Sequence, residues 1–291
     1  MVAIDIDGTL LHSAGTTISN RNRRVLREVQ AAGIEVVIAT GRRQAYAAPL
    51  LVPVGLRPET VFITSNGAVT RTFAGERIDR FTLPVETARE LCPALRPFGG
   101  TTVFTFDREG PGELVLESAA QLHARISLWV DANRPWIEEV NPLERAFDSG
   151  EPPVQGMVCG TLPEMIRAEE WLATSELSSR IETHRTEYPR RDLCILDILP
   201  PGCSKGIALG RLAQSRGIDA SEIMAIGDNL NDLEMLRYAG HPVVMTNAAP
   251  SLLATAKQSG WRIAPPNDHD GVAQVLESVL TSLNVTSGRG R

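Results

Sequence analysis

Short apolar stretches near the start of the chain predict buried, parallel β-strands. Residues 2–6 (V-A-I-D-I), 34–40 (I-E-V-V-I-A-T) and 61–64 (V-F-I-T) lack the regular polar alternation of a strand with one solvated face. Apolar residues with helical spacing lie between them, in residues 19–33 and 44–51. This alternation of strands and helices is typical of an α/β fold with helices on both faces of a parallel sheet.

The same alternation returns in the last third of the chain. Strands are predicted at residues 222–226, 242–245 and 261–264, and a final helix at 271–283. A further helix is predicted directly after Ser204, a residue type suited to the N-cap position. The two ends of the chain are therefore expected to contribute to one doubly wound sheet.

The segment between these two parts does not follow the strand–helix alternation. Helical patterns at residues 84–95 and 163–172 are mixed with short strand-like runs at 101–106, 113–117, 155–160 and 193–199. Such a mixture is typical of a separate α+β unit. We therefore expect a Rossmann-like core domain formed by residues 1–80 and 201–291, interrupted by an inserted α+β domain of residues 81–200.

Polar residues collect where the predicted core strands end. Because the carboxyl ends of parallel strands share one edge of a sheet, side chains that follow different strands meet there. In a strand, residues two apart point the same way, so Asp5 and Asp7 are expected to place two carboxylates on one side of the chain. Two adjacent anions are tolerated when a divalent cation bridges them or when one stays protonated. The residues expected at this edge are Asp5, Asp7, Thr40, Gly41, Asn66, Lys205, Asp228, Asn231 and Asp232.

This set of groups is complete for a reaction at a phosphate monoester. An aspartate oxygen can attack phosphorus, Mg²⁺ between Asp5 and Asp228 would cancel the charge repulsion, and Lys205 with N–H donors would hold the phosphate oxygens. Each of these segments alone is also common in proteins without such a site. Asp-Gly often forms a turn, Thr-Gly often connects a strand to a helix, and most lysines lie on the surface. The sequence G-D-N-L-N-D after an apolar strand is more specific, because an ordinary turn has no use for so many acids and amides.

Composition narrows the class of protein. A length of 291 residues, with 43% hydrophobic and 22% charged residues, fits an ordinary globular protein of about two domains. The net charge of −6, without a basic cluster, argues against nucleic acid and anionic membranes as partners. The four cysteines lack metal-binding spacing, and no apolar run reaches the ~20 residues of a membrane span. With no signal-peptide pattern in the first residues, we expect a cytoplasmic protein.

Lysine is rare in this chain. Of the 29 basic residues only Lys205 and Lys257 are lysine, and the others are arginine. In a chain with this bias, a lysine that opens a predicted helix indicates a need for a compact cation at that point.

The chain resembles the Cof-like branch of the haloacid dehalogenase-like phosphatases in five motifs: D-I-D-G-T-L-L, A-T-G-R, S-N-G-A, P-G-C-S-K-G and G-D-N-L-N-D-L-E-M-L. The resemblance implies a cap domain inserted after S-N-G-A. It also implies that Asp5 is the nucleophile and Asp7 the general acid and base. By the same resemblance, Mg²⁺ is held by Asp5, Asp228 and the backbone carbonyl of Asp7. The phosphate-binding residues would be Thr40, Gly41, Lys205 and Asn231, with Asn66 and Asp232 in supporting roles.

The chain departs from the family pattern at two places. Only four residues precede Asp5, where the family has a longer first strand, so either this strand is short or the natural chain starts further upstream. At Thr246 the family usually has glycine, and we expect this change to alter a loop near the phosphate site.

We therefore predict a Mg²⁺-dependent phosphatase that hydrolyses phosphate monoesters of small molecules, such as a sugar phosphate or a phosphorylated cofactor, through an aspartyl-phosphate. A phosphomutase would need the same two aspartates and would differ in passing the phosphoryl group to a second hydroxyl. A non-catalytic phosphoaspartyl signalling module would not need the large insertion or a second acid at Asp7. Dehalogenase chemistry in this superfamily does without Mg²⁺ and is less favoured.

Overall fold

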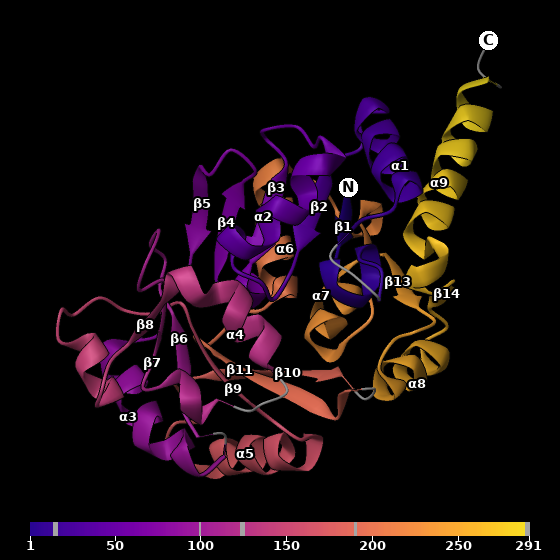
Figure 1. The fold of residues 1–291 in the computed structure, drawn as a ribbon. Coiled ribbons are helices and arrows are strands. Elements are labelled where there is room, and N and C mark those ends of the chain that lie inside the picture. The colour runs from indigo at the N-terminus through magenta and orange to yellow at the C-terminus, as the bar shows by residue number, and fades with distance from the viewer. Residues whose placement is uncertain (14–16, 99, 123–125, 189–190, 289–291) are drawn as a thin grey trace. The chain divides into compact units, whose positions relative to one another are not determined.

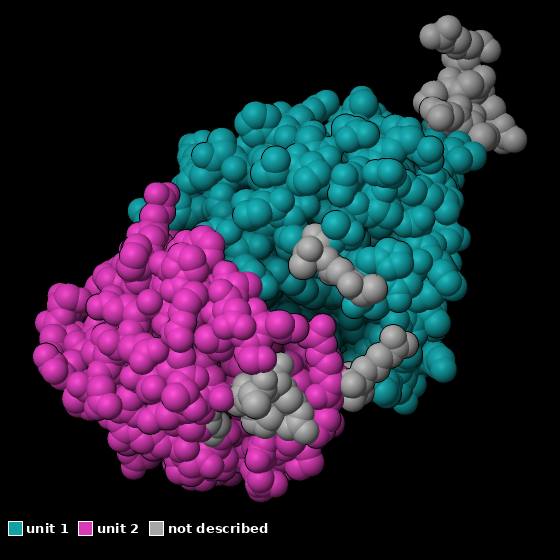
Figure 2. All heavy atoms as spheres, in the orientation of Figure 1, with its two compact units in different colours: residues 1–78, 205–291 teal, residues 79–204 magenta. Residues whose placement is uncertain are grey.

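The computed structural model describes residues 1–13, 17–98, 100–122, 126–188 and 191–288 (Figure 1). The chain divides into two compact units, one formed by residues 1–78 and 205–291 and the other by residues 79–204 (Figure 2). Each unit has its own sheet and its own hydrophobic core. Among the described residues, no helix has both the length and the apolar character needed to cross a lipid bilayer.

The first unit is built on an eight-stranded sheet. Its strands are β1 (Val2–Ile4), β2 (Val36–Ala39), β3 (Val61–Thr64), β4 (Val69–Thr72), β5 (Arg77–Arg80), β12 (Met224–Gly227), β13 (His241–Met245) and β14 (Arg262–Ala264). Their order across the sheet is β14-β13-β12-β1-β2-β3-β4-β5. All neighbours from β14 to β3 are parallel, and β4 is antiparallel to β3. The first strand of the chain therefore lies in the interior of the sheet, between β12 and β2.

Helices cover both faces of this sheet (Figure 1). Val2 and Ile4 of β1 belong to one buried cluster and Ala3 to the other, so β1 is covered on both faces. This arrangement confirms the predicted doubly wound α/β core. One cluster includes residues of α1 (Asn20–Ala31), α2 (Gln44–Leu51) and α9 (Gly271–Gly288), and the other includes residues of α6 (Lys205–Arg216), α7 (Leu233–Tyr238) and α8 (Pro250–Gln258).

The second unit contains a six-stranded sheet in the order β10-β11-β9-β6-β7-β8. Its neighbouring strands are antiparallel except for the parallel pair β7 and β8. Helices α3 and α5 pack on one face of this sheet through a cluster that contains Phe104, Val158 and Leu196. The elements are α3 (Val85–Leu95), β6 (Val103–Thr105), β7 (Leu114–Leu116), α4 (Ser127–Asn133), β8 (Ile137–Glu139), β9 (Gln155–Gly160), α5 (Leu162–Thr174), β10 (Glu182–Tyr188) and β11 (Leu193–Leu199). Strands β8 and β10 and helix α4 were not predicted from the sequence.

Helix α6 packs closely against α7 in the first unit. A Cβ atom on Gly206 would lie 2.6 Å from the backbone carbonyl carbon of Glu234, so a larger residue cannot fit without movement of the backbone. Because Lys205 is the first residue of α6, this contact helps to determine where the Lys205 side chain lies.

The variant Gly206→Ala should lower the free energy of unfolding by ~1–3 kcal/mol, because the added methyl group must push α6 away from α7. Urea denaturation followed by circular dichroism measures this change. Gly210→Ala is the control in the same helix, since the nearest atom to its Cβ belongs to the Tyr238 side chain, at 3.3 Å, which can move. An unchanged urea midpoint in Gly206→Ala would contradict the packing described for α6.

Candidate active site

The loop that follows β1 turns sharply. Strand β1 ends at Ile4, and residues Ile6–Leu10 form an irregular turn in which Asp7 is extended and Gly8 has a φ of 74°. A Cβ atom on Gly8 would lie 2.1 Å from Oδ2 of Asp228, so only glycine allows the loop to approach this carboxylate. The predicted strand through residue 6 is thus too long, because the chain leaves strand geometry before Ile6.

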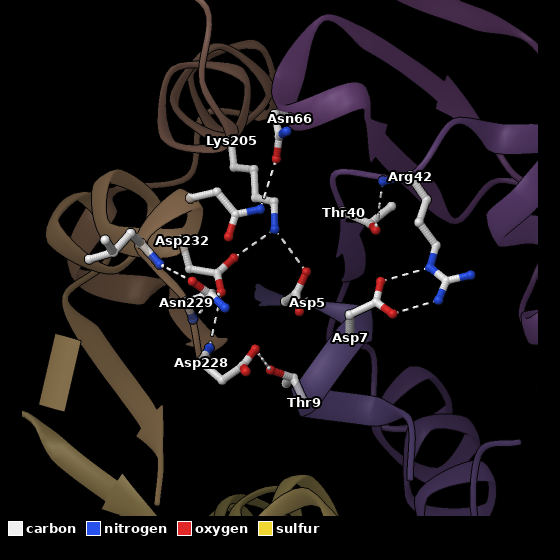
Figure 3. Close-up of polar contacts among 12 residues, drawn as sticks. Asp5, Asp7, Thr9, Thr40, Arg42, Asn66, Lys205, Asp228, Asn229 and Asp232 are labelled. Atoms are coloured by element: carbon white, nitrogen blue, oxygen red, sulfur yellow. Dashed lines mark hydrogen bonds and ion pairs between the residues drawn. The ribbon is translucent and has the colours of Figure 1, made fainter. Parts of the chain in front are cut away.

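The two aspartates that were expected on one side of the chain have different hydrogen-bond partners. Because the residues after Ile4 are not in a strand, the two side chains do not follow strand alternation. Asp5 points toward Lys205, whereas Asp7 points toward Arg42 (Figure 3). The two carboxylates thus have different partners, although Asp7 lies near enough to Asp5 for its charge to raise the Asp5 pKa.

Lys205 lies at the centre of a buried ionic network (Figure 3). Its side chain has no exposed surface, and its Nζ donates to Oδ1 of Asp5 at 2.8 Å and to Oδ1 of Asp232 at 2.7 Å. The other oxygen of Asp232 accepts the backbone N–H groups of Asp228 at 3.0 Å and Asn229 at 3.1 Å. Both Asp232 oxygens are thus engaged by the chain itself, which favours a supporting role for this residue.

Burial dominates the electrostatics of this network. Loss of solvation raises the pKa of Asp5, and the nearby Asp232 and Asp7 raise it further, although Lys205 acts in the opposite direction. Burial also raises the pKa of Asp228, with added repulsion from Asp5 and Asp232. For Lys205, burial alone would lower the pKa, but the carboxylates of Asp232 and Asp5 outweigh it and raise the pKa above its usual value. The site therefore holds carboxylates in excess over the single charge of Lys205.

A cation fits this excess of carboxylates. Oxygen atoms of Asp5, Asp228 and Asp232 lie within 4.8 Å of one another and all three residues are buried. Carboxylate oxygens are the preferred ligands of Mg²⁺, and a bound cation would remove the repulsion that raises the pKa values of Asp5 and Asp228. The donor set thus suits Mg²⁺, and Asp5 and Asp228 have more free oxygen positions than Asp232.

Asp7 is held by Arg42 outside this carboxylate group. Nε of Arg42 donates to Oδ2 of Asp7 at 2.7 Å, and Nη2 donates to Oδ1 at 2.5 Å. The guanidinium of Arg42 also lies 4.4 Å from the centre of the Tyr46 ring. Both Asp7 oxygens are thus engaged by Arg42, whereas the Asp7 backbone carbonyl stays a candidate ligand for a metal ion.

The expected phosphate-binding residues lie at the ends of neighbouring strands. Thr40 is fully buried after β2, and its Oγ1 accepts the backbone N–H of Arg42 at 3.1 Å, which leaves the hydroxyl proton available. Gly41 follows it, and within the described ranges its N–H makes no hydrogen bond. Asn231, after β12, donates from Nδ2 to Oδ1 of Asn66 at 2.9 Å. The structure thus brings Thr40 and Asn66 to the carboxyl edge of the sheet, where Asp5 and Asp228 also lie (Figure 3). The hydrogen bond to Asn66 places Asn231 there as well.

Three further residues support the site and were not assigned a role from the sequence. Thr9 donates from Oγ1 to Oδ1 of Asp228 at 3.2 Å, Asn247 donates from Nδ2 to the Gly8 carbonyl at 2.8 Å, and Arg42 holds Asp7. Thr9 and Arg42 lie inside the D-I-D-G-T and A-T-G-R motifs, which is the signal that could have identified them. Thr246, the departure from the family pattern, directs its hydroxyl to the Ala264 carbonyl at 2.5 Å.

Comparisons with known proteins agree with this fold. The family model for haloacid dehalogenase-like hydrolases matches residues 2–276. The chain is 30% identical, over an alignment of length 296, to 5-amino-6-(5-phospho-D-ribitylamino)uracil phosphatase YwtE of Bacillus subtilis, with 96% of this chain and 98% of the relative covered. It is 29% identical to the HMP-PP phosphatase of Serratia proteamaculans, with 98% and 97% covered.

Solved structures show the same fold. A haloacid dehalogenase-like hydrolase from Bacteroides thetaiotaomicron is 28% identical, with a TM-score of 0.75 and with 96% of this chain and 98% of that chain covered. The chain belongs to the haloacid dehalogenase-like hydrolases. It is therefore an enzyme of the hydrolase class, which confirms the family and the enzyme class expected from its motifs.

The variant Lys205→Arg should lower kcat/KM by about 10²-fold, the usual effect of removing one well-placed electrostatic donor. A guanidinium is wider than an ammonium and cannot keep both contacts in a site with no exposed surface. Steady-state kinetics with a phosphate ester measures the effect. Lys257→Arg, at an exposed position in α8, is the matched control and should behave as wild type. Wild-type kcat/KM in Lys205→Arg would show that this lysine has no part in the reaction.

Proposed function

We propose that this protein is a Mg²⁺-dependent phosphatase that hydrolyses phosphate monoesters of small molecules through an aspartyl-phosphate on Asp5. The observation that carries the proposal is the buried network of Asp5, Lys205 and Asp232 beside Asp228, at the carboxyl edge of the sheet. Relatives with phosphatase names, aligned over almost the whole chain, support it.

Asp5, Asp228 and the backbone carbonyl of Asp7 would hold Mg²⁺. Bound there, the ion supplies positive charge beside the phosphate, which lowers the cost of bringing an anionic ester to an anionic nucleophile. Thr9 and Gly8 keep Asp228 in place, by a hydrogen bond and by close backbone approach respectively.

Asp5 is the group that attacks phosphorus. One of its carboxylate oxygens forms a bond to phosphorus while the bond from phosphorus to the ester oxygen breaks. Lys205 contacts Oδ1 of Asp5 and favours the ionised carboxylate that this attack requires. Lys205, the Thr40 hydroxyl, the Gly41 N–H and the Asn231 amide are the donors available to the remaining phosphate oxygens.

Asp7 serves as general acid and then as general base. It gives a proton to the departing ester oxygen and later takes a proton from the water that attacks the aspartyl-phosphate. That second attack breaks the bond between phosphorus and Asp5 and releases inorganic phosphate. Because Arg42 engages both Asp7 oxygens, Asp7 must leave at least one of these contacts to donate a proton.

The substrate class is a small phosphorylated molecule, either a sugar phosphate or a phosphorylated cofactor. The relatives named above act on a phosphorylated ribitylaminouracil and on HMP-PP, which are small phosphorylated compounds. We propose that the second unit, residues 79–204, acts as a cap domain that determines which ester is accepted. The cytoplasmic location stays a prediction from the sequence.

The purified protein should release inorganic phosphate from at least one member of a panel of sugar phosphates, phosphorylated cofactors and nucleotides. Release should require Mg²⁺, stop with a chelator and return when Mg²⁺ is added again. Transfer of phosphate to a second hydroxyl, without free phosphate, would instead identify a phosphomutase. Full activity in the presence of chelator would contradict the proposed metal dependence.

The variant Asp5→Asn should release no phosphate above background, because an amide cannot form the aspartyl-phosphate. Acid quenching followed by intact-mass spectrometry should detect a phosphorylated chain in the wild type during turnover and none in Asp5→Asn. Asp219→Asn, at an exposed turn far along the chain, is the control and should turn over normally. Detection of a phosphorylated Asp5→Asn chain would show that another residue is the nucleophile.

The variant Arg42→Met should lower kcat for alkyl phosphates by at least ~10-fold, since general acid catalysis contributes ~10²–10⁴ and depends on the position of Asp7. An activated aryl phosphate needs no proton on its leaving group, so its phosphorylation step should change little. The ratio of the kcat/KM values of the two substrates separates loss of proton transfer from general damage, because kcat/KM reports the phosphorylation step and not the later hydrolysis that both substrates share. Equal losses in kcat/KM for both substrates would show that Arg42 does not act through Asp7.

A further inference from the structure

The turn after β3 has an unusual backbone. Ser65, Asn66 and Gly67 follow one another with positive φ values of 48°, 54° and 105°. Positive φ is costly for residues other than glycine, and two such residues in sequence require strong local support. All three residues are buried. A strained and buried turn of this kind indicates that its side chains are needed at particular positions.

Backbone hydrogen bonds tie this turn to the loop that follows β2. The Asn66 N–H donates to the Thr40 carbonyl at 3.1 Å, and the Ser65 N–H donates to the Arg42 carbonyl at 3.0 Å. The turn therefore cannot move without the Thr40–Arg42 loop, which carries the proposed phosphate-binding groups. The strain in the turn is thus coupled to the shape of that loop.

The Asn66 amide lies between Gly41 and Asn231. A Cβ atom on Gly41 would lie 3.1 Å from Oδ1 and 3.2 Å from Nδ2 of Asn66, so the amide packs on the Gly41 backbone. On its other side, Oδ1 of Asn66 accepts the Asn231 Nδ2–H at 2.9 Å, and Asn66 is 1% exposed (Figure 3). Gly41 follows β2 and Asn231 follows β12, and these two strands flank β1. Asn66 thus connects the loops on the two sides of β1, the strand that precedes Asp5.

We propose that Asn66 is a positioning residue that sets the spacing and orientation of two phosphate-binding groups, the Gly41 N–H and the Asn231 amide. The proposal rests on the phosphatase function proposed above. Asparagine meets three requirements at this position. It adopts positive φ more readily than most residues, it supplies a carbonyl acceptor for Asn231, and unlike aspartate it adds no negative charge beside a phosphate.

The variant Asn66→Gly tests this role, because glycine keeps the backbone conformation and removes only the amide. We expect the inhibition constant of inorganic phosphate to rise about tenfold, since the buried Asn231 donor loses its acceptor and is free to turn. The KM for a phosphate ester should rise more than kcat falls. Ser65→Gly is the matched control, because it relieves the neighbouring positive φ without changing any group proposed to bind phosphate.

A double-mutant cycle with Asn231→Ala shows whether Asn66 acts through Asn231. If it does, Asn66→Gly should weaken phosphate binding less in the Asn231→Ala background than in the wild type, because the effects of coupled residues do not add and only the contact with Gly41 is left to lose. Gly41→Ala gives a second measurement that leaves Asn66 in place. Its methyl group should displace the amide and raise the phosphate inhibition constant in the wild-type background, but add nothing in Asn66→Gly.

The outcomes separate this inference from the proposed function. Wild-type phosphate affinity in a folded Asn66→Gly, or additive losses in the double variant, would overturn the positioning role while the enzyme remains a phosphatase. If Asn66→Gly does not fold, the phosphate affinity of Gly41→Ala decides, and an unchanged value rejects the proposal. If the wild-type protein itself neither hydrolyses phosphate esters nor binds phosphate, the proposed function has failed instead.

Discussion

A single buried cation holds the first unit's site together. Lys205 has no exposed surface, and its charge is balanced by Asp5 from the start of the chain and Asp232 from near its end. Removing one partner of such a buried pair typically costs ~3–5 kcal/mol, because the remaining charge is left uncompensated. The start of the chain must therefore meet two segments of its last third around this ammonium. The close contact of Gly206 with α7 positions Lys205, and the end of β1 at Ile4 positions Asp5.

The carboxylates around Lys205 outnumber its charge, and this imbalance has a use. Asp228 is buried beside Asp5, and repulsion together with lost solvation raises the pKa values of both. A protein that only needed stability would not bury this many acids. The arrangement favours a bound cation, and a cation in turn favours an anionic substrate. The same buried acids that lower the stability of the free protein would thus favour cation binding.

Much of the fold and the site was predictable from the sequence, for physical reasons. Core strands such as β2 and β3 are buried on both faces, so their apolar runs are continuous, and the motif residues follow their carboxyl ends. Strands β8 and β10 were missed because they lie at the two edges of their sheet and consist largely of polar residues, as in E-T-H-R-T-E-Y. The pairing of Asp7 with Arg42 was missed because it depends on the turn after Ile4. Strand periodicity does not describe such a turn.

The order of strands in the eight-stranded sheet bears on how the protein is made. Strand β1 pairs on one side with β2, which follows soon in the chain, and on the other with β12, which begins at Met224. During synthesis the ribosome therefore produces β1 to β5 and the whole second unit before it produces β12, the second partner of β1. Until then, one edge of an apolar strand has no neighbour, and such edges pair readily with other chains. The late segment from Lys205 onward supplies Lys205 and Asp228 to the candidate site and also covers this edge, so the edge of β1 stays open to pairing with other chains until the last third of the chain emerges.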